Sequence, residues 1–358
     1  MKAAAVAALL LAVVCGCTQQ KVDASPSSPG PGTAPPTRTT SGPPPTSTTA
    51  PPTSAAQPPT GDRYVALAGA LHKRGVEIWW ETDLVARWLE GPAAFNTAIT
   101  RLGKLAKAPG VVGFKISDEI GYGDGLGSPA DATRFLTQVR TALARVAPGK
   151  QLLVDAIVPE LGCLPWRGTN QLDCAQRARL KYPAATAAAV EDYLRAKLID
   201  RLDLSTGLLD ESTYRKWGTT KRDAQADAWN RVTEQGWPQL TILQARKALA
   251  VPNGYQGNAD QAAADVGTYI DAPVAAGARA VDIWTWRQRY NGDIVSLLGP
   301  DLSPNPLWTA LAQQHRRGAQ FFTHMTPSTM PTDQRGFDQE CNLAASVFTA
   351  VFVAAGTG

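Results

Sequence analysis

The sequence predicts a parallel β/α barrel of eight strands. Apolar and polar residues alternate along residues 111–119, so this strand has one apolar and one polar face. From residue 62 onward, short apolar strands alternate with amphipathic helices. A barrel accommodates a central strand with a polar face, because helices cover the outside while side chains at the carboxyl ends of the strands line the mouth.

The first 60 residues are expected to lie outside the barrel. Residues 1–17 combine a charged start with an apolar run at residues 3–14, which is typical of an export signal and short for a membrane span. Residues 18–60 are rich in Pro, Thr and Ser, which predicts a disordered linker. Residues 61–358 then form the barrel domain.

The cysteines indicate an exported protein. The segment Val14-Cys15-Gly16-Cys17 resembles the lipobox of bacterial lipoproteins. This resemblance implies cleavage before Cys17, a diacylglycerol on its thiol, and a location on the outer face of the cytoplasmic membrane; a plain secretory signal is the alternative. Cys163 and Cys174 lie eleven positions apart and are predicted to form a disulfide, and Cys341 is expected to be a buried free thiol.

Each element follows from its pattern. Strands are predicted at residues 76–81, 111–119, 151–158, 201–207, 240–244 and 280–286, and helices at 62–74, 82–107, 129–146, 184–197, 212–235, 259–276 and 306–316. Strands at 320–325 and 347–354, with a helix at 333–345 between them, complete a TIM barrel. The chain then starts on a helix and ends on a strand, so the strand order is rotated by two units. The alternative is a six- or seven-stranded barrel with a terminal helix.

The polar parity of the strands gathers acids, tryptophans and one lysine at the axis. Lys115 needs an anionic partner in a dry interior, and Glu77 and Asp155 are the candidates; Asp203 and Asp282 share this parity and are predicted to be structural. Aromatic faces stack on sugar rings while carboxylates bind hydroxyl groups, so this composition indicates a carbohydrate site. The candidate catalytic residues are Glu119, Glu81, Asp155 and Asp118, and the candidate substrate-binding residues are Trp79, Trp284, Trp286, Arg246, Gln244, His324 and Tyr122.

Several other functions are disfavoured. The net charge of +4 is small and scattered, which argues against nucleic-acid binding. Three histidines without zinc-type His and Cys spacing predict no metal site, and we expect no cofactor and a monomer. The turn from Gly121 to Gly125 lacks the lysine of a phosphate-binding loop and the spaced acids of a calcium loop, and no Gly-x-Ser-x-Gly nucleophile motif is present.

The barrel resembles the glycoside hydrolase barrels, and in particular glycosidase-like lipoproteins of high-GC Gram-positive bacteria. In the rotated order, Ser117-Asp118-Glu119 ends the fourth strand, where many retaining glycosidases carry their acid/base Glu. The segment from Val281 to Trp286 ends the eighth strand, where those barrels often carry a subsite Trp. One departure concerns the seventh strand, which ends on Gln244 where those families place the nucleophile Glu.

The resemblance implies hydrolysis of a polysaccharide or glycoconjugate with Glu119 as general acid. Its partner would be Glu81 or Asp155, or else Asp118 in the manner of the hexosaminidase Asp-Glu pair. Such hydrolysis normally needs two carboxyl groups, about 5 Å apart for retention or roughly 6.5–9.5 Å for inversion. The competing hypothesis is a barrel that binds carbohydrate without cleaving it, or that acts as a surface scaffold, which Gln244 favours.

Overall fold

The structure is a computed structural model that describes residues 62–354, except residues 169, 206–208, 246, 248 and 291. The predicted signal peptide, the lipobox with Cys17, the linker at residues 18–60, and Arg246 therefore lie outside the described residues. Within the part that is described, no helix is both long enough and apolar enough to cross a bilayer.

Eight parallel strands close into a barrel. They follow the order β5-β4-β3-β2-β1-β10-β9-β7, and pairing of β5 with β7 closes the ring. The predicted eight-stranded (β/α)8 barrel is confirmed, and the six- or seven-stranded alternative is wrong. The strands are β1 (Glu77–Glu81), β2 (Val111–Lys115), β3 (Gln151–Ile157), β4 (Arg201–Ser205), β5 (Thr241–Gln244), β7 (Ala280–Tyr290), β9 (Gln320–Met325) and β10 (Ala350–Ala354).

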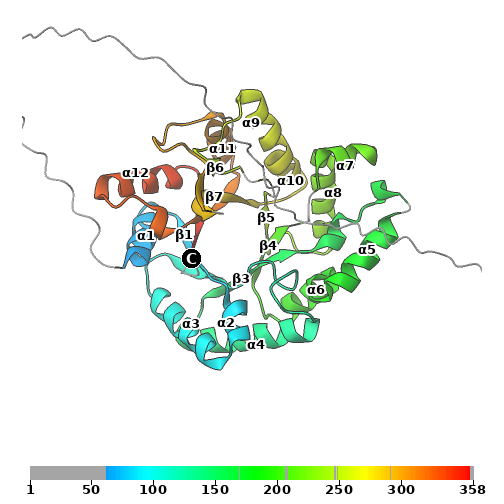
Figure 1. The fold of residues 1–358 in the computed structure, drawn as a ribbon, viewed down its shortest axis with the longest axis horizontal. Coiled ribbons are helices and arrows are strands. Elements are labelled where there is room, and N and C mark those ends of the chain that lie inside the picture. The colour runs from blue at the N-terminus through cyan, green and yellow to red at the C-terminus, as the bar shows by residue number, and fades with distance from the viewer. Residues whose placement is uncertain are drawn as a thin grey trace, which may run out of the picture. The chain divides into compact units, whose positions relative to one another are not determined.

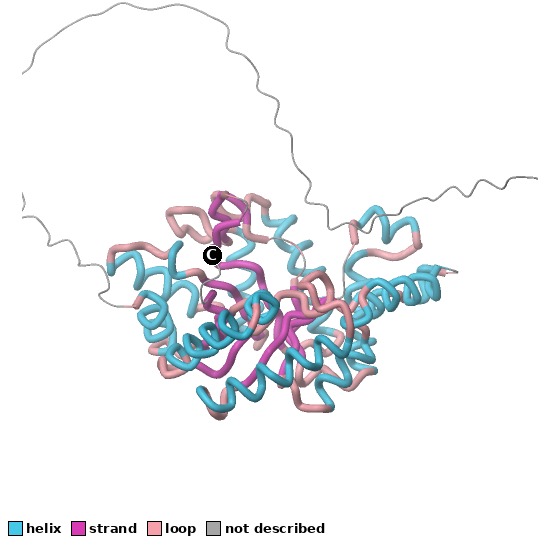
Figure 2. Tube along the Cα trace, turned by 60° about the horizontal axis from the view of Figure 1, so that its bottom comes forward, coloured by secondary structure: helices cyan, strands magenta, loops and turns pink. Residues whose placement is uncertain are grey.

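Helices surround these strands, as Figure 1 and Figure 2 show. They are α1 (Arg63–His72), α2 (Leu84–Glu90), α3 (Pro92–Leu105), α4 (Pro129–Val146), α5 (Asn170–Lys181), α6 (Ala187–Arg195), α7 (Glu211–Lys216), α8 (Lys221–Glu234), α9 (Ala259–Val266), α10 (Ala272–Ala275), α11 (Pro306–Arg316) and α12 (Gln334–Ala345). Short 3₁₀ segments lie at Pro159–Gly162, Pro165–Arg167, Pro183–Ala185 and Pro327–Thr329, and a π turn lies at Gly267–Asp271.

The predicted helix at residues 82–107 is two helices in the structure. Gly91 separates α2 from α3 with a φ of 115°, a conformation that strongly favours glycine, and Pro92 starts the second helix. Helix α1 contacts α12 and β1, so the first helix packs on the outside of the barrel, where an ordinary barrel has its last helix, as expected. Helix α5 was not predicted, because none of its residues is buried and it lacks the apolar stripe of a helix that packs on the core.

Strand β7 is longer than predicted and extends beyond the barrel. Its last residues, Arg287 to Tyr290, pair antiparallel with β8 (Asp293–Ser296), which in turn pairs with β6 (Val251–Pro252). The register of β7 against β9 shifts between Ile283 and Arg287. Beyond this irregularity, side chains no longer alternate between the two faces of the strand. The predicted inward direction of the last residues therefore does not hold.

Two apolar layers hold the barrel together. The larger one lies between the strands and the helices and includes Ile78, Trp80, Phe114 and Phe321. The second fills the barrel interior and consists of Trp79, Leu153, Ile242, Ala280, Phe322, Ala350 and Phe352. A barrel filled in this way is a packed core, so chemistry has to take place at its mouth.

Candidate functional site

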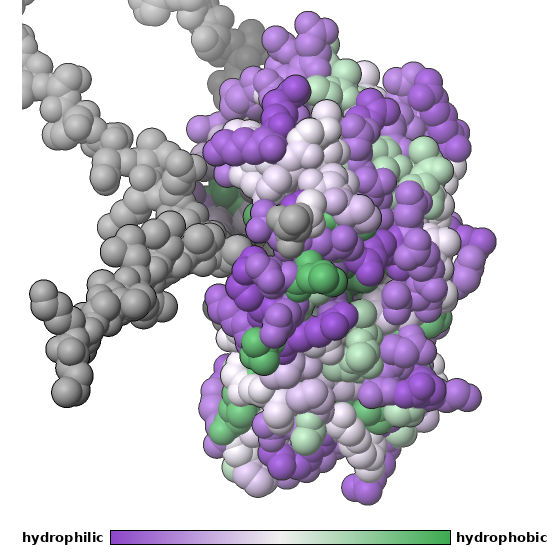
Figure 3. Space-filling view, turned by 90° about the vertical axis from the view of Figure 1, so that its right-hand side faces the viewer, coloured by the Kyte–Doolittle hydropathy of each residue, from purple (hydrophilic) through white to green (hydrophobic). Residues whose placement is uncertain are grey.

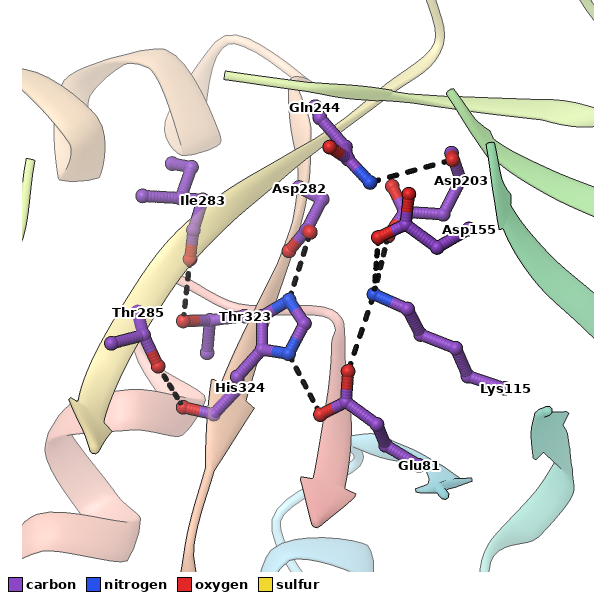
Figure 4. Close-up of polar contacts among 10 residues, drawn as sticks. All are labelled: Glu81, Lys115, Asp155, Asp203, Gln244, Asp282, Ile283, Thr285, Thr323 and His324. Atoms are coloured by element: carbon purple, nitrogen blue, oxygen red, sulfur yellow. Dashed lines mark hydrogen bonds and ion pairs between the residues drawn. The ribbon is translucent and has the colours of Figure 1, made fainter. Parts of the chain in front are cut away.

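A polar layer lies on top of the apolar interior, towards the carboxyl ends of the strands. Register pairing places Glu81 beside Lys115, Asp155 beside Asp203, and Gln244 beside Asp282. We call this set the lumen cluster; it takes one side chain from each of seven strands: Glu81, Lys115, Asp155, Asp203, Gln244, Asp282 and His324 (Figure 4).

Lys115 is the centre of one half of the lumen cluster. Its Nζ atom lies 2.8 Å from Asp203 Oδ2, 3.2 Å from Asp155 Oδ2 and 3.3 Å from Glu81 Oε1. Burial by itself lowers the pKa of Lys115, but these carboxylates outweigh burial and raise the pKa well above its ordinary value. The ammonium therefore stays protonated, which excludes Lys115 as the amine nucleophile of a Schiff base. The predicted ion pair with Asp155 is confirmed, whereas Glu77 is exposed.

His324 is the centre of the other half. Its Nδ1 lies 2.9 Å from Glu81 Oε2, and its Nε2 lies 2.9 Å from Asp282 Oδ2. A neutral imidazole has one N–H, so two carboxylate partners require the imidazolium form. Burial opposes this charge, but Asp282 and Glu81 raise the pKa of His324 to about 10. Burial likewise acts against ionised Glu81, yet His324 and Lys115 lower its pKa to about 2.

The lumen cluster has more acids than bases. Glu81, Asp155, Asp203 and Asp282 face only Lys115 and His324. Burial raises the pKa of Asp203 well above its usual value, and the attraction of Lys115 opposes this rise. For Asp282, the attraction of His324 outweighs burial and lowers the pKa. One oxygen each of Asp155, Asp203 and Asp282 has no hydrogen-bond partner among the described residues.

A cation could in principle be held by part of this cluster. Asp203, Asp282 and His324 each offer a ligand atom, and these atoms lie within 4.8 Å of one another. Both nitrogens of His324 already bind carboxylates, and the Lys115 ammonium lies on Asp203. A metal ion at this place would have to displace a proton of the His324 imidazolium and lie close to the Lys115 ammonium. The arrangement therefore fits a metal ion poorly, because His324 and Lys115 already neutralise these acids.

The candidate acids Asp118 and Glu119 lie on a turn rather than on a strand. Strand β2 ends at Lys115, so the expected strand to residue 119 is too long, and strand alternation does not orient these two side chains. Asp155 holds the turn at both ends: its carbonyl accepts from Ile120 N at 2.9 Å, and its own N donates to Ser117 O at 3.4 Å. Glu119 adopts a φ of 51°, which is uncommon for a residue other than glycine.

Asp118 has the properties of a general acid. It is exposed at the barrel mouth, although surrounding protein displaces part of its hydration. This desolvation and the carboxylate of Asp155 raise the pKa of Asp118 to about 6, with smaller effects from Lys115, Glu119 and Glu81. Asp118 therefore lies within electrostatic range of Asp155, Lys115 and Glu81 of the lumen cluster.

The structure brings only some of the predicted substrate-binding residues to the mouth. Trp79 is buried in the apolar interior below the lumen cluster. Trp286 packs against Trp308 and Phe348 on the outside of the barrel, because the irregular register of β7 turns it away from the axis. Its indole N–H donates to Glu340 Oε2 at 3.0 Å. Neither position suits contact with substrate, so we correct the assignment of both.

Other predicted residues lie nearer the surface. Trp284 is half-buried and packs edge-on against Tyr290. Tyr122 stacks on Tyr182 with ring centroids 4.1 Å apart. The buried Gln244 donates from Nε2 to the backbone carbonyl of Asp203 at 3.4 Å, and His324 belongs to the lumen cluster, where it contacts carboxylates of the protein itself.

One aromatic cluster was missed in the sequence. Trp166 and Trp217 stack with ring centroids 5.4 Å apart, and the guanidinium of Arg167 lies 4.4 Å from the Trp217 ring centroid. These residues come from the segments that follow β3 and β4, on the mouth side of the barrel. The sequence could have indicated this cluster, because both tryptophans lie in segments that follow the end of a predicted strand.

Both cysteine predictions within the described residues are confirmed. Cys163 and Cys174 form a disulfide with Cα atoms 5.6 Å apart, and Cys341 is a buried free thiol. The disulfide joins the segment after β3 to α5.

Comparisons with known proteins assign neither a family nor a function to this chain. No protein-family model and no curated protein sequence matches the chain. Among solved structures, a β-glycosidase is 15% identical over 73% of this chain and 76% of its own, with a TM-score of 0.37. A putative deoxyribose-phosphate aldolase from Toxoplasma gondii ME49 is 12% identical over 81% and 92%, with a TM-score of 0.39.

A methylaspartate ammonia lyase from Clostridium tetanomorphum, an L384A mutant, is 13% identical over 79% of this chain and 54% of its own, with a TM-score of 0.40. These three barrels differ in chemistry, and their identities and TM-scores are too low to carry an argument about function. The class of this protein therefore follows from its strand pairing: it is a (β/α)8 barrel.

Proposed function

We propose that this barrel is a glycoside hydrolase that cleaves a polysaccharide or glycoconjugate at its mouth. In this proposal Asp118 is the general acid and Asp155 is the general base. The observation that carries the proposal is the exposed position of Asp118 at the mouth near Asp155, where desolvation and that neighbouring carboxyl group raise the pKa of Asp118 to about 6. Two carboxyl groups in opposite protonation states are what acid/base cleavage of a glycosidic bond requires.

Asp118 suits the acid role because it is accessible and remains partly protonated near neutral pH. It would donate its proton to the glycosidic oxygen as the bond from that oxygen to the anomeric carbon breaks. A water molecule would attack the anomeric carbon and give its proton to the base. The sugar is released as a hemiacetal and the leaving group as an alcohol, so atoms and charge balance.

Asp155 suits the base role better than Glu81 does. Both oxygens of Glu81 are bound, one to Lys115 and one to His324, and its pKa of about 2 makes it a weak base and a weak nucleophile. Asp155 uses one oxygen to bind Lys115, and its Oδ1, although buried, has no hydrogen-bond partner among the described residues, so it can accept a proton from a water that enters from the mouth. We assign Glu81 a different role, which is to stabilise positive charge that develops on the sugar ring in the transition state.

The aromatic side chains on the mouth side support a carbohydrate as the substrate. Tyr122, Trp166, Trp217 and Trp284 are each partly exposed; the first three lie on segments that follow the carboxyl ends of β2, β3 and β4, and Trp284 lies within β7. Aromatic faces of this kind can stack on the C–H faces of sugar rings.

The test is a screen of the purified chain on aryl glycosides and on bacterial and plant polysaccharides, with product analysis of any hit. Asp118→Asn and Asp155→Asn are expected to lower kcat by at least about 100-fold while the fold and ligand binding persist. Glu119→Gln is the matched control beside Asp118. Loss of activity in Glu119→Gln but not in Asp118→Asn would move the acid role to Glu119 and contradict our assignment.

A second candidate function is carbohydrate binding without cleavage. The observation that favours it is Gln244, a buried amide at the end of β5 where the resembled families have a nucleophile. In that case a glycan array gives specific binding, Asp118→Asn leaves it unchanged, and prolonged incubation gives no products.

We also propose that the chain is exported and anchored by a lipid on Cys17. The disulfide between Cys163 and Cys174 is consistent with an oxidising compartment. Metabolic labelling of the expressed protein with a fatty acid is expected to mark the wild-type chain and not Cys17→Ser. Equal labelling of both proteins, or of neither, contradicts the anchor.

A further inference from the structure

We propose that the outer face of helix α5 is a second membrane contact, which binds the surface of a bilayer that contains anionic lipids. This inference is independent of the hydrolase proposal, because it uses residues outside the mouth. It concerns how the barrel lies on a membrane and not what the barrel cleaves.

The first observation is the exposure of two leucines. Leu172 and Leu180 are 80% and 76% exposed, whereas the next most exposed leucine of the described residues, Leu89, is 51% exposed. They are eight residues apart on one helix, so they share a face and lie about 12 Å apart along the axis. Figure 3 views the side of the molecule on which α5 lies in Figure 1, and isolated hydrophobic side chains appear there among hydrophilic ones.

The second observation is the charge beside these leucines. Arg177, Arg179 and Lys181 are exposed on α5, and Asp173 is its one acid. Basic residues that flank apolar ones on a helix surface are the composition of interfacial helices, where leucine enters the lipid boundary and arginine or lysine binds anionic headgroups. This charge complementarity selects an anionic membrane rather than an apolar protein groove.

The third observation is that the barrel presents this helix firmly. The disulfide fixes Cys174 to Cys163, and Arg179 Nε donates to Glu160 Oε2 at 2.6 Å. The helix has no buried residue, so these links hold it to the barrel while its outer face stays exposed to solvent. A pre-ordered face needs less ordering when it binds.

The distance from the predicted anchor is compatible with this contact. Residues 18–61 separate Cys17 from the described domain, and a chain of that length spans at most about 150 Å. A tethered barrel therefore stays close to the bilayer, and even weak affinity of α5 then produces substantial contact, because the tether raises the effective concentration.

The test measures hydrogen exchange of residues 170–181 in the full-length Cys17→Ser chain with phosphatidylcholine vesicles, with or without phosphatidylglycerol. This local readout separates α5 from any binding through the N-terminal apolar segment. We expect slower exchange of α5 only with the anionic vesicles. The double variant Leu172→Ser with Leu180→Ser should require at least about tenfold more anionic lipid for the same protection of α5. The control variant Leu89→Ser should not change this lipid requirement.

A matched pair of arginines tests the charge contribution. Arg177 and Arg195 are 70% and 71% exposed, and each forms an ion pair within its own helix. Arg177→Gln should weaken anionic vesicle binding, and Arg195→Gln should not. Equal protection by both kinds of vesicle, or no protection, overturns the proposal. Protection that grows with protein concentration without vesicles also overturns it, since the partner would then be a second copy of the chain.

Discussion

His324 Nδ1 lies 2.9 Å from Glu81 Oε2, and this contact joins the two halves of the lumen cluster. Through it, charges alternate across the barrel from Asp282 to His324, Glu81, Lys115 and Asp203. Such an arrangement fixes the height and orientation of Glu81 at the mouth. The lumen cluster thus holds Asp155 in place, and the proposed proton transfers involve this residue and Asp118, which lies at the mouth outside the cluster.

Replacement of Lys115 tests this framework. Lys115→Met removes the cation that Asp203, Asp155 and Glu81 share, and uncompensated buried charge is costly. We expect the free energy of unfolding in urea to fall by about 3–5 kcal/mol. The exposed residue Lys104 serves as the control, and Lys104→Met should change stability by less than about 0.5 kcal/mol. Equal effects of both substitutions would show that the ammonium is not a structural centre.

The imidazolium of His324 makes stability depend on alkaline pH. Its folded-state pKa of about 10 is above the ordinary value of 6.5, so its stabilising contribution is full below about pH 6.5 and is lost as pH rises towards 10. We expect the free energy of unfolding to fall by more than about 1 kcal/mol across this window, and to fall less in His324→Gln. Identical pH dependence in the two proteins would mean that His324 is neutral in the folded state.

Glu81 gives the corresponding effect in acid. Its folded-state pKa of about 2 lies below the ordinary 4.5, so its contribution is present above about pH 4.5 and is lost as pH falls towards 2. Glu81→Gln should therefore flatten the loss of stability in this window, measured by urea unfolding at stepped pH. A wild-type curve that is already flat there is the outcome that contradicts the ion pairs of Glu81.

The disulfide should stabilise α5 more than the barrel. The link closes a loop with a sequence separation of 11, for which chain entropy predicts about 2–3 kcal/mol. Because α5 has no buried residue, we expect Cys163→Ser with Cys174→Ser to speed hydrogen exchange at residues 170–181 while the barrel strands keep their protection. Unchanged exchange in α5 would show that other contacts hold it.

Trp286 is expected to affect stability and not ligand binding. Its indole N–H satisfies the buried carboxylate of Glu340, which also binds Arg287. Trp286→Phe should lower the free energy of unfolding by about 1–3 kcal/mol and leave affinity for any glycan ligand unchanged. Trp284→Phe, on the same strand, should show the opposite pattern. Loss of ligand affinity in Trp286→Phe would restore its predicted substrate-binding role.

The barrel itself was predictable because strand alternation and helix periodicity are local signals. All eight parallel strands lie within the predicted ranges or overlap them, and the parity rule placed Lys115 and Asp155 together. The rule failed where the backbone leaves ideal geometry. Strand β2 stops at Lys115 instead of reaching Glu119, and the shifted register of β7 turns Trp286 outward.

The exact partners of the charges could not be predicted for a different reason. His324 and Asp282 are distant in sequence, and their contact depends on how far each strand is staggered around the closed barrel. The sequence pattern shows which residues of a strand point inward, but it does not show how far one strand is shifted along the next. For the same reason the sequence did not show that Glu81 has both oxygens occupied, which is what moves the base role to Asp155.

The most direct test of the account is the ionisation of Asp118, measured by carbon-13 NMR of the carboxyl group in wild type and in Asp155→Asn. The account predicts a midpoint near pH 6 in wild type and a clearly lower midpoint in the variant, because the variant lacks the neighbouring carboxylate charge. A wild-type midpoint near the ordinary value of about 3.9, unchanged in Asp155→Asn, would contradict the proposed acid and base pair.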